Sequence, residues 1–247
     1  MPVRKTSPKP QIRDQVSRGR PADGRTRSAA TEPPLVDGAA LEEIFRRFAE
    51  TSPAPRGELE HQDAYQLLVA VVLSAQATDR SVNLATGPLF ALADTPAAMV
   101  ALGEDGLIEH IRTIGLFRTK ARNVIALSQR LLDEHGGIVP PSRTYLESLP
   151  GVGRKSASVV LNSVFGEPTI AVDTHVFRVS HRIPIARGRT PDDVQRELEA
   201  RIPSEYLLYA HHWLILHGRY TCKARTPDCP GCLIRDLCRY PDKTPPA

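Results

Sequence analysis

The chain has 247 residues, of which 41% are hydrophobic and 24% charged, and its formal net charge is +4. This length is enough for one large or two modest domains with a sizeable core, so the fold does not need disulfides for stability. All four cysteines lie between residues 222 and 238, which excludes a disulfide-stapled secreted fold and favours a reducing, cytoplasmic compartment.

Residues 1–35 are predicted to form a disordered basic arm, because they are rich in Pro, Arg, Ser and Ala and have little to bury. Residues 1–34 carry a net charge of +5, which leaves −1 for the rest of the chain. The arm is either a solvated tail, a segment attracted to phosphates or a targeting peptide. No stretch has the roughly 18 apolar residues of a membrane span, so we expect no membrane partner.

From Leu41 onward, apolar residues recur at helical spacing and no alternating strand pattern appears, so we expect an all-α fold. Thr95 and Thr190 each precede a proline, which is typical of a capped helix start. Gly136 and Gly218 are expected to end helices in the left-handed conformation. The predicted helices cover residues 39–51, 63–77, 79–90, 96–102, 105–113, 119–135, 142–149, 154–165, 174–182, 191–201 and 206–217.

Residues 149–161 read LPGVGRKSASVVL, a short glycine-flanked turn between two predicted helices, which is a helix-hairpin-helix. Gly151 and Gly153, on either side of Val152, let a partner approach the backbone closely. The free amides at the start of the second helix point at an anion, and a DNA phosphate is the natural ligand. A bare Gly-x-Gly can also be a simple connector between packed helices.

Lys155 lies in the first turn of the second hairpin helix. The positive end of the helix dipole and the neighbouring Arg154 both disfavour a protonated amine there, which favours a nucleophile. A neutral amine can attack carbon. If that carbon is C1′ of a nucleotide, the base leaves, a Schiff base remains, and proton loss from C2′ permits elimination of the 3′ phosphate.

The cysteines follow the spacing Cys-x6-Cys-x2-Cys-x5-Cys within one compact segment, which suggests a metal site and differs from the paired Cys-x2-Cys of a zinc ribbon. The spacing by itself leaves zinc and an iron–sulfur cluster both open. Lys223 and Arg225 lie between the first two cysteines and either contact DNA phosphates or belong to an ordinary solvated loop. The four predicted ligands are Cys222, Cys229, Cys232 and Cys238.

The hairpin string, together with TIAVDTHVFRV at residues 169–179, resembles the endonuclease III family, whose members are helical DNA glycosylases with lyase activity. The resemblance spans roughly residues 36–240. It implies that Lys155 is the nucleophile and that Asp173 assists deprotonation and stabilises developing charge. Asp173 also suits a helix cap, and both roles can coexist. For the four cysteines, the resemblance implies a [4Fe-4S] cluster.

The resemblance also implies two helical lobes. A central domain over residues 57–168 contains the helix-hairpin-helix. A discontinuous iron–sulfur cluster domain combines residues 36–56 with residues 169–240, and a tail follows at 241–247.

A base must leave the duplex before an amine can reach its sugar, and the resemblance implies which side chains fill the gap. These are Gln76 in LSAQATD and Leu116 in TIGLFRTKA. Without the resemblance, Gln76 is a polar residue at a helix end and Leu116 a minor core residue. His175 is expected to contact the DNA backbone. Three further histidines on one apolar helix are interpreted as structural, namely His211, His212 and His217.

The expected function is base excision repair of duplex DNA by a monomer associated with the nucleoid. It includes removal of oxidised or ring-saturated pyrimidines and cleavage 3′ to abasic sites by β-elimination. Adenine-mismatch glycosylases share the hairpin, the aspartate and the cluster, but they normally lack the lysine and add a C-terminal domain. This chain has Lys155 and stops nine residues after Cys238. A catalytically silent hairpin protein and an iron–sulfur redox sensor are the alternatives from other classes.

Overall fold

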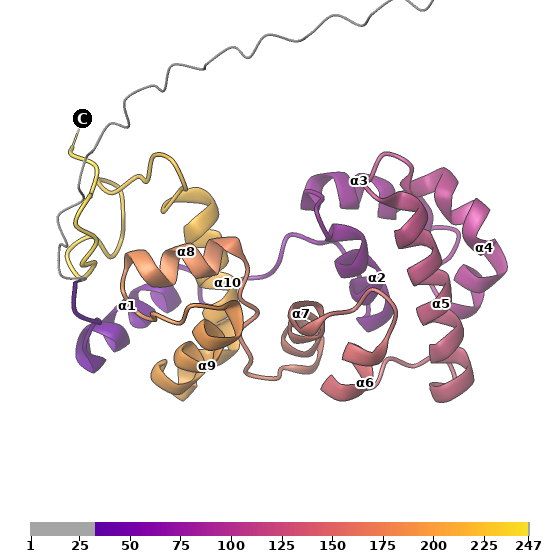
Figure 1. The fold of residues 1–247 in the computed structure, drawn as a ribbon, viewed down its shortest axis with the longest axis horizontal. Helices are drawn as coiled ribbons and strands as arrows, with labels where there is room; N and C mark the ends of the chain where they lie inside the picture. The colour runs from indigo at the N-terminus through magenta and orange to yellow at the C-terminus, as the bar shows by residue number, and fades with distance from the viewer. Residues whose placement is uncertain (1–32, 247) are drawn as a thin grey trace, which may run out of the picture. The chain divides into compact units, whose positions relative to one another are not determined.

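The computed structural model describes residues 33–246, and this part of the chain contains helices and no strand, which confirms the all-α prediction (Figure 1). Residues 1–32, which hold most of the predicted basic arm, lie outside the described residues. The helices are α1 (Gly38–Thr51), α2 (Ala64–Ser74), α3 (Asp79–Phe90), α4 (Pro96–Ile111), α5 (Phe117–His135), α6 (Arg143–Ser148), α7 (Arg154–Phe165), α8 (Thr174–Arg182), α9 (Pro191–Arg201) and α10 (Ser204–Tyr220).

The described helices surround two hydrophobic cores (Figure 1). The first core is built by α2 to α7, and α2 is its centre, because the helix is buried on all sides from Tyr65 to Leu73. The second core is built by α1 and α8 to α10, with Phe45 stacked on Tyr206 and close to Trp213. The lobe boundaries expected near residues 57 and 168 lie in the loops between α1 and α2 and between α7 and α8.

Side-chain caps define most helix starts. Thr95 accepts a hydrogen bond from the Ala98 amide at the start of α4, as its sequence context predicts. At α9, Thr190 and Asp193 form a reciprocal capping box, in which each side chain satisfies the other's backbone amide. Because these hydrogen bonds join residues only three positions apart, they set the first residue of each helix independently of its tertiary packing.

Two helices differ from the prediction in instructive ways. The expected helices 96–102 and 105–113 join into α4, but Gly103 interrupts it with φ 72° and ψ 173°, so the predicted break is real. The helix expected over 63–77 ends at Ser74, because Gln76 turns the chain with a positive φ of 56°.

The predicted left-handed cap at Gly136 is confirmed, whereas the one at Gly218 is wrong. Gly218 lies inside α10, which continues to Tyr220. A Cβ at this position would lie 2.9 Å from the Cβ of His175 and 3.1 Å from Cγ2 of Val179. Glycine is therefore required there because α8 and α10 pack closely, and not because the backbone turns.

The described ends of the chain are bound to the second group of helices. The predicted arm extends to residue 35, but the Val36 amide donates to the Pro184 carbonyl at 2.9 Å and the Arg239 guanidinium donates to the Leu35 carbonyl. In the expected tail, the Thr244 hydroxyl donates to the Pro227 carbonyl at 2.7 Å. Residues 33–35, at the end of the predicted arm, therefore contact the second group of helices. Among the described helices, none is long and apolar enough to cross a bilayer.

Candidate active site

A cavity of about 840 Å³ lies between α7, the end of α2 with the start of α3, and α10. Lys155 and Asp173, which are 18 positions apart in the sequence, both line it. On α7 the lining residues Lys155, Val159 and Asn162 recur at helical spacing, so one face of the helix forms one wall. The structure therefore brings the two residues singled out for catalysis into one cavity.

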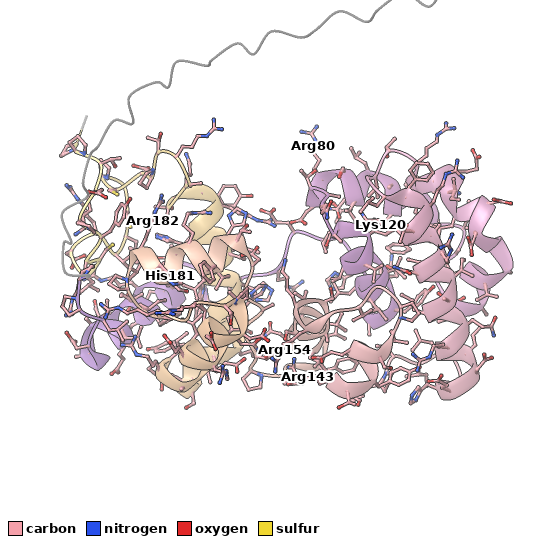
Figure 2. The ribbon with its side chains drawn as sticks, viewed as in Figure 1. Arg80, Lys120, Arg143, Arg154, His181 and Arg182 are labelled. Carbon is pink, nitrogen blue, oxygen red and sulfur yellow. The ribbon has the colours of Figure 1, made fainter. Side chains whose placement is uncertain are left out.

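Lys155 is the second residue of α7 and its side chain is exposed. The N-cap residue Gly153 provides no side-chain hydrogen bond, so the amides of the first turn remain open to an anion. Arg154 lies in an ion pair with Asp192 at the start of α9, with an N–O distance of 2.9 Å (Figure 2). Its charge is therefore partly compensated, which weakens the expectation that Arg154 disfavours an ammonium at Lys155.

Asp173 is the N-cap of α8, as the sequence predicts. Its Oδ1 accepts hydrogen bonds from the amides of His175 and Val176, both at 2.8 Å. Within the described residues, no hydrogen bond engages its Oδ2. One oxygen thus holds the start of the helix, and the other is available to the cavity.

Two buried histidines of α10 lie behind this pair. His211 and His212 line the cavity, and the Nδ1 atoms of both have no hydrogen-bond partner among the described residues. Burial lowers the pKa of His211 to about 3, and the nearby His212 acts in the same direction. The charge of Asp173 raises this pKa slightly and that of Lys155 lowers it, and both residues line the same cavity as His211. The floor of the cavity is therefore neutral near pH 7.

A charged group that sequence reasoning missed forms another wall of the cavity. Nη1 of Arg219, on α10, pairs with a carboxylate oxygen of Asp79 at 2.6 Å and also with Glu58. The Tyr220 hydroxyl donates a second hydrogen bond to Glu58. The only local signal was that Asp79 closes the LSAQATD segment, because Arg219 and Glu58 meet it only in the tertiary fold.

The two hairpin glycines serve different purposes. Gly151 has a φ of +79°, and a Cβ there would lie 2.8 Å from Nδ2 of Asn123, so the turn requires glycine. Gly153 has φ −99° and ψ 178°, an ordinary extended conformation, with no atom within 4 Å of an added Cβ. Between them, Val152 is buried in the first core and its amide donates to the Leu149 carbonyl at 3.1 Å. The open space before Gly153 leaves the helix start accessible.

Gln76 and Leu116 share an unusual backbone. Both are non-glycine residues with positive φ, 56° and 61°, and both side chains are exposed, Leu116 by 59%. The interpretation of Leu116 as a core residue is therefore wrong. Left-handed backbone at a non-glycine residue is strained, and such strain gathers at functional positions. Gln76 lines the cavity and Leu116 does not.

The four cysteines are half-buried and form no disulfide. No three Cys, His, Asp or Glu side chains of residues 33–246 converge into a group that fits a metal ion as placed. Burial raises the pKa of the Cys232 thiol to about 11, and the charges of the other three cysteines act in the same direction. The sulfurs of Cys222 and Cys238 both lie against Arg182, at 3.7 Å from its Nη1 and 3.8 Å from its carbonyl oxygen. Four cysteine thiols are the donor set that an iron–sulfur cluster requires, so the chemistry of these side chains fits that group.

Arginines of α8 hold the backbone of this loop. Nε of Arg178 donates to the Cys222 carbonyl at 3.2 Å, and Arg182 donates to the carbonyls of Lys223 and Ala224 at 2.6 and 2.7 Å (Figure 2). The side chains of Lys223 and Arg225 remain exposed. Nothing in the local sequence singled out Arg178 or Arg182, because their role depends on the packing of α8 against the loop.

His175 and His217 have different surroundings from those of Lys155 and Asp173. Nδ1 of the half-buried His175 lies 3.3 Å from a guanidinium nitrogen of Arg178, which also donates to the Cys222 carbonyl of the cysteine loop. His217 is buried, and its Nε2 lies 3.9 Å from the sulfur of Cys232. Neither residue lines the cavity.

Comparison with known proteins agrees with this architecture. The profile of the HhH-GPD superfamily base excision DNA repair proteins matches residues 69–204. The chain is 54% identical to endonuclease III of Treponema pallidum over 204 residues, which is 83% of this chain and 97% of the relative. It is 53% identical to endonuclease III of Escherichia coli (strain K12) over 201 residues, which is 81% of this chain and 95% of the relative.

Solved structures give the same result. A trapped endonuclease III–DNA covalent intermediate matches with a TM-score of 0.77 and 43% identity, and covers 83% of this chain and 97% of that chain. A thermostable thymine-DNA glycosylase shares the fold, with a TM-score of 0.73 at 21% identity over 82% of this chain and 96% of that chain. The superfamily match contains the hairpin, Lys155 and Asp173. The chain belongs to the endonuclease III family.

Proposed function

We propose that this protein is a base excision repair DNA glycosylase with lyase activity at abasic sites, and that Lys155 is its nucleophile. The observation that carries the proposal is the placement of Lys155 and Asp173 in one cavity, with the amine on an uncapped helix start. A relative has been trapped as a covalent intermediate with DNA, which supports a mechanism in which the enzyme forms a covalent bond to its substrate. The adenine-mismatch reading is disfavoured because those enzymes normally lack this lysine.

In the proposed reaction, the neutral Lys155 amine attacks C1′ of the extruded nucleotide, and the C1′–N bond to the base breaks. The base leaves with the bonding electrons and takes a proton. The nitrogen then loses its second proton as the ring oxygen leaves C1′, and the protein–DNA imine forms. Loss of a proton from C2′ expels the 3′ phosphate. The free Oδ2 of Asp173 is the proposed acceptor for the amine proton and the counter-charge for the sugar.

For the nucleotide to reach this cavity, the duplex must open. We propose that Gln76 and Leu116 fill the vacated stack, and their exposure and strained backbone support this role. The hairpin of Gly151, Val152 and Gly153 presents the amides of its two glycines to a backbone phosphate, whereas the Val152 amide is bonded within the turn. Three further proposed contacts to the DNA backbone are His175, Lys223 and Arg225.

The proposed substrates are oxidised or ring-saturated pyrimidines in duplex DNA, together with abasic sites. Because genomic DNA is the substrate, the proposed place of action is the nucleoid. The walls of the cavity come from both groups of helices, and both groups belong to one chain. A monomer therefore has all the proposed catalytic residues.

We further propose that Cys222, Cys229, Cys232 and Cys238 hold a [4Fe-4S] cluster. When bound, such a cluster ties the cysteine loop together and needs to take no part in bond breaking. The chain's own contribution is the anchoring of that loop by Arg178 and Arg182. Metal analysis of anaerobically purified protein tests this, with about four irons per chain expected. Zinc at full occupancy without iron contradicts it.

Borohydride trapping on duplex DNA with a single abasic site tests the catalytic proposal. Wild-type protein is expected to form a reduced covalent adduct and to cut the strand, whereas Lys155→Ala forms no adduct and keeps the visible absorption of the cluster. Arg196→Ala is the matched control, because it removes an exposed cation of α9 outside the cavity, and it should retain trapping. An adduct with Lys155→Ala, or no adduct with the wild type, overturns the assignment.

A further inference from the structure

The charged wall of the cavity is more than an ion pair between α3 and α10. Arg219 is 25% exposed and Asp79 16% exposed at their side chains, so the pair is largely shielded from water. Both bonds from Arg219 to carboxylates use Nη1. Among the described residues, no hydrogen bond engages its Nε or Nη2, or the Oδ1 of Asp79. Within the part of the chain that the structure describes, the ion pair therefore carries two free donor groups, on Arg219, and one free acceptor, the Oδ1 atom of Asp79.

This pair lines the same cavity as the proposed nucleophile. On α10, His212, Ile215 and Arg219 recur at helical spacing and face the cavity together. Asp173 lines this cavity as well, so the guanidinium of Arg219 and the proposed catalytic groups face the same space. A nucleotide whose sugar lies at Lys155 would therefore extend its base along this wall.

We infer that Arg219 and Asp79 recognise the imide edge of the extruded pyrimidine, with Arg219 donating to a ring carbonyl and Asp79 accepting from N3–H. The inference rests on the proposed function and adds the residues that choose its substrate. Uracil- and thymine-derived bases keep the sequence O=C–N(H)–C=O when C5 and C6 are oxidised or saturated, so one arrangement serves many lesions. A base with an unprotonated N3 presents an acceptor to the Asp79 carboxylate and is disfavoured.

The alternative role of this pair is purely mechanical, because it also links helices from the two cores. The two roles differ in what they predict for DNA that has already lost its base. A mechanical link affects every reaction in the cavity, whereas a base-reading pair affects only substrates that carry a base.

The experiment uses the full chain and measures single-turnover cleavage of three duplexes, which carry 5,6-dihydrouracil, its N3-methyl derivative or an abasic site. Asp79→Ala is expected to slow removal of dihydrouracil by about 10- to 100-fold, at least about tenfold more than it slows cleavage at the abasic site. Asp79→Asn, which keeps an acceptor but loses the ion pair with Arg219, is expected to recover part of this loss. N3-methylation should impair the wild type and add little to the loss in Asp79→Ala.

Asp37→Asn is the matched control, because it breaks another ion pair between distant segments, to Arg239, outside the cavity, and Asn still caps α1. It should leave all three rates near those of the wild type. Equal losses on base-bearing and abasic duplexes, failure of Asp79→Asn to recover activity, or unchanged discrimination against the N3-methyl base in Asp79→Ala would each overturn the inference. Failure of the wild type to cut the abasic duplex is a separate result, because it refutes the proposed function itself.

Discussion

The two oxygens of Asp173 illustrate how a single residue combines a structural and a chemical role. Oδ1 accepts hydrogen bonds from two amides of the first turn of α8, at His175 and Val176, whereas none of residues 33–246 donates to Oδ2. A capping aspartate is already oriented by the helix that it caps, so its second oxygen needs no further support to face the cavity. The two roles can therefore be separated by substitution.

Replacing Asp173 by Asn should slow imine formation by about 10²- to 10⁴-fold, because the amide still caps α8 but neither accepts the amine proton nor balances positive charge. The free energy of unfolding should change by less than about 1 kcal/mol, since Asn and Asp cap equally well. Single-turnover trapping and urea unfolding measure the two effects. In the control Asp173→Ala, about 1 kcal/mol of stability is lost as well. Wild-type trapping by Asp173→Asn is incompatible with the proposed role.

His211 makes stability depend on pH. Its folded-state pKa of about 3, lowered by burial, lies below the value of about 6.5 for an unfolded chain. The unfolded chain therefore binds more protons between these values, and the free energy of unfolding falls as the pH drops below about 6.5. Between pH 6.5 and 5 this residue should account for about 2 kcal/mol.

Urea unfolding of His211→Gln across this pH range measures the effect, and a shallower pH dependence than that of the wild type is expected. His135→Gln serves as the control, because His135 is exposed at the end of α5. Identical slopes for His211→Gln and the wild type would show that this ring takes up a proton without unfolding.

At the scale of elements, glycine at two helical positions has opposite consequences. Gly218 lies where α10 crosses α8, and an added Cβ would meet His175 at 2.9 Å. Gly87 lies inside α3, with no atom within 4 Å of an added Cβ. The first glycine permits helix packing, and the second only weakens its helix.

Gly218→Ala should lower the free energy of unfolding by about 1–3 kcal/mol, because the two helices must separate to admit the methyl group. Gly87→Ala should raise it by about 0.5–1 kcal/mol through helix propensity. Thermal or urea unfolding of both variants provides the comparison. Stabilisation by Gly218→Ala contradicts the close crossing of α8 and α10.

At the scale of the whole molecule, a polar network follows the chain from one core to the other. Arg143 on α6 donates to Ser158 on α7 at 2.8 Å and to Glu167 in the following loop at 2.8 Å. In the same loop, the Thr169 hydroxyl donates to Glu199 on α9 at 2.9 Å, and the Ile170 amide donates to it at 3.0 Å. This loop leads directly to Asp173, so the network fixes where that carboxylate lies.

Arg143→Ala should cost about 2 kcal/mol of stability, because it removes charged hydrogen bonds and leaves the partly buried acceptors Ser158 and Glu167 unmatched. It should also slow imine trapping by about tenfold or more, since Asp173 loses its fixed position. Arg46→Ala, which removes ion pairs to Glu43 and Glu50 within α1, is the control for loss of an arginine. Unaltered trapping in Arg143→Ala would separate the network from catalysis.

The sequence by itself determined the helices, their caps, the hairpin and the positions of Lys155 and Asp173. These features depend on hydrogen bonds and side-chain periodicity within a few residues, so the local sequence contains the information needed to predict them. The proposed reaction came from the resemblance of the hairpin string to a known family. The same resemblance favoured an iron–sulfur cluster at the cysteines, where spacing alone did not distinguish it from zinc.

Only the tertiary structure decided which distant residues share the cavity. Arg219 is 140 positions from Asp79, and the two form an ion pair because α3 and α10 approach one another in space. The same holds for Gly218, whose role is set by its neighbour α8, and for residues 33–35, which the local composition assigned to the arm. Contacts between elements depend on packing across the whole fold, and no short stretch of sequence encodes them.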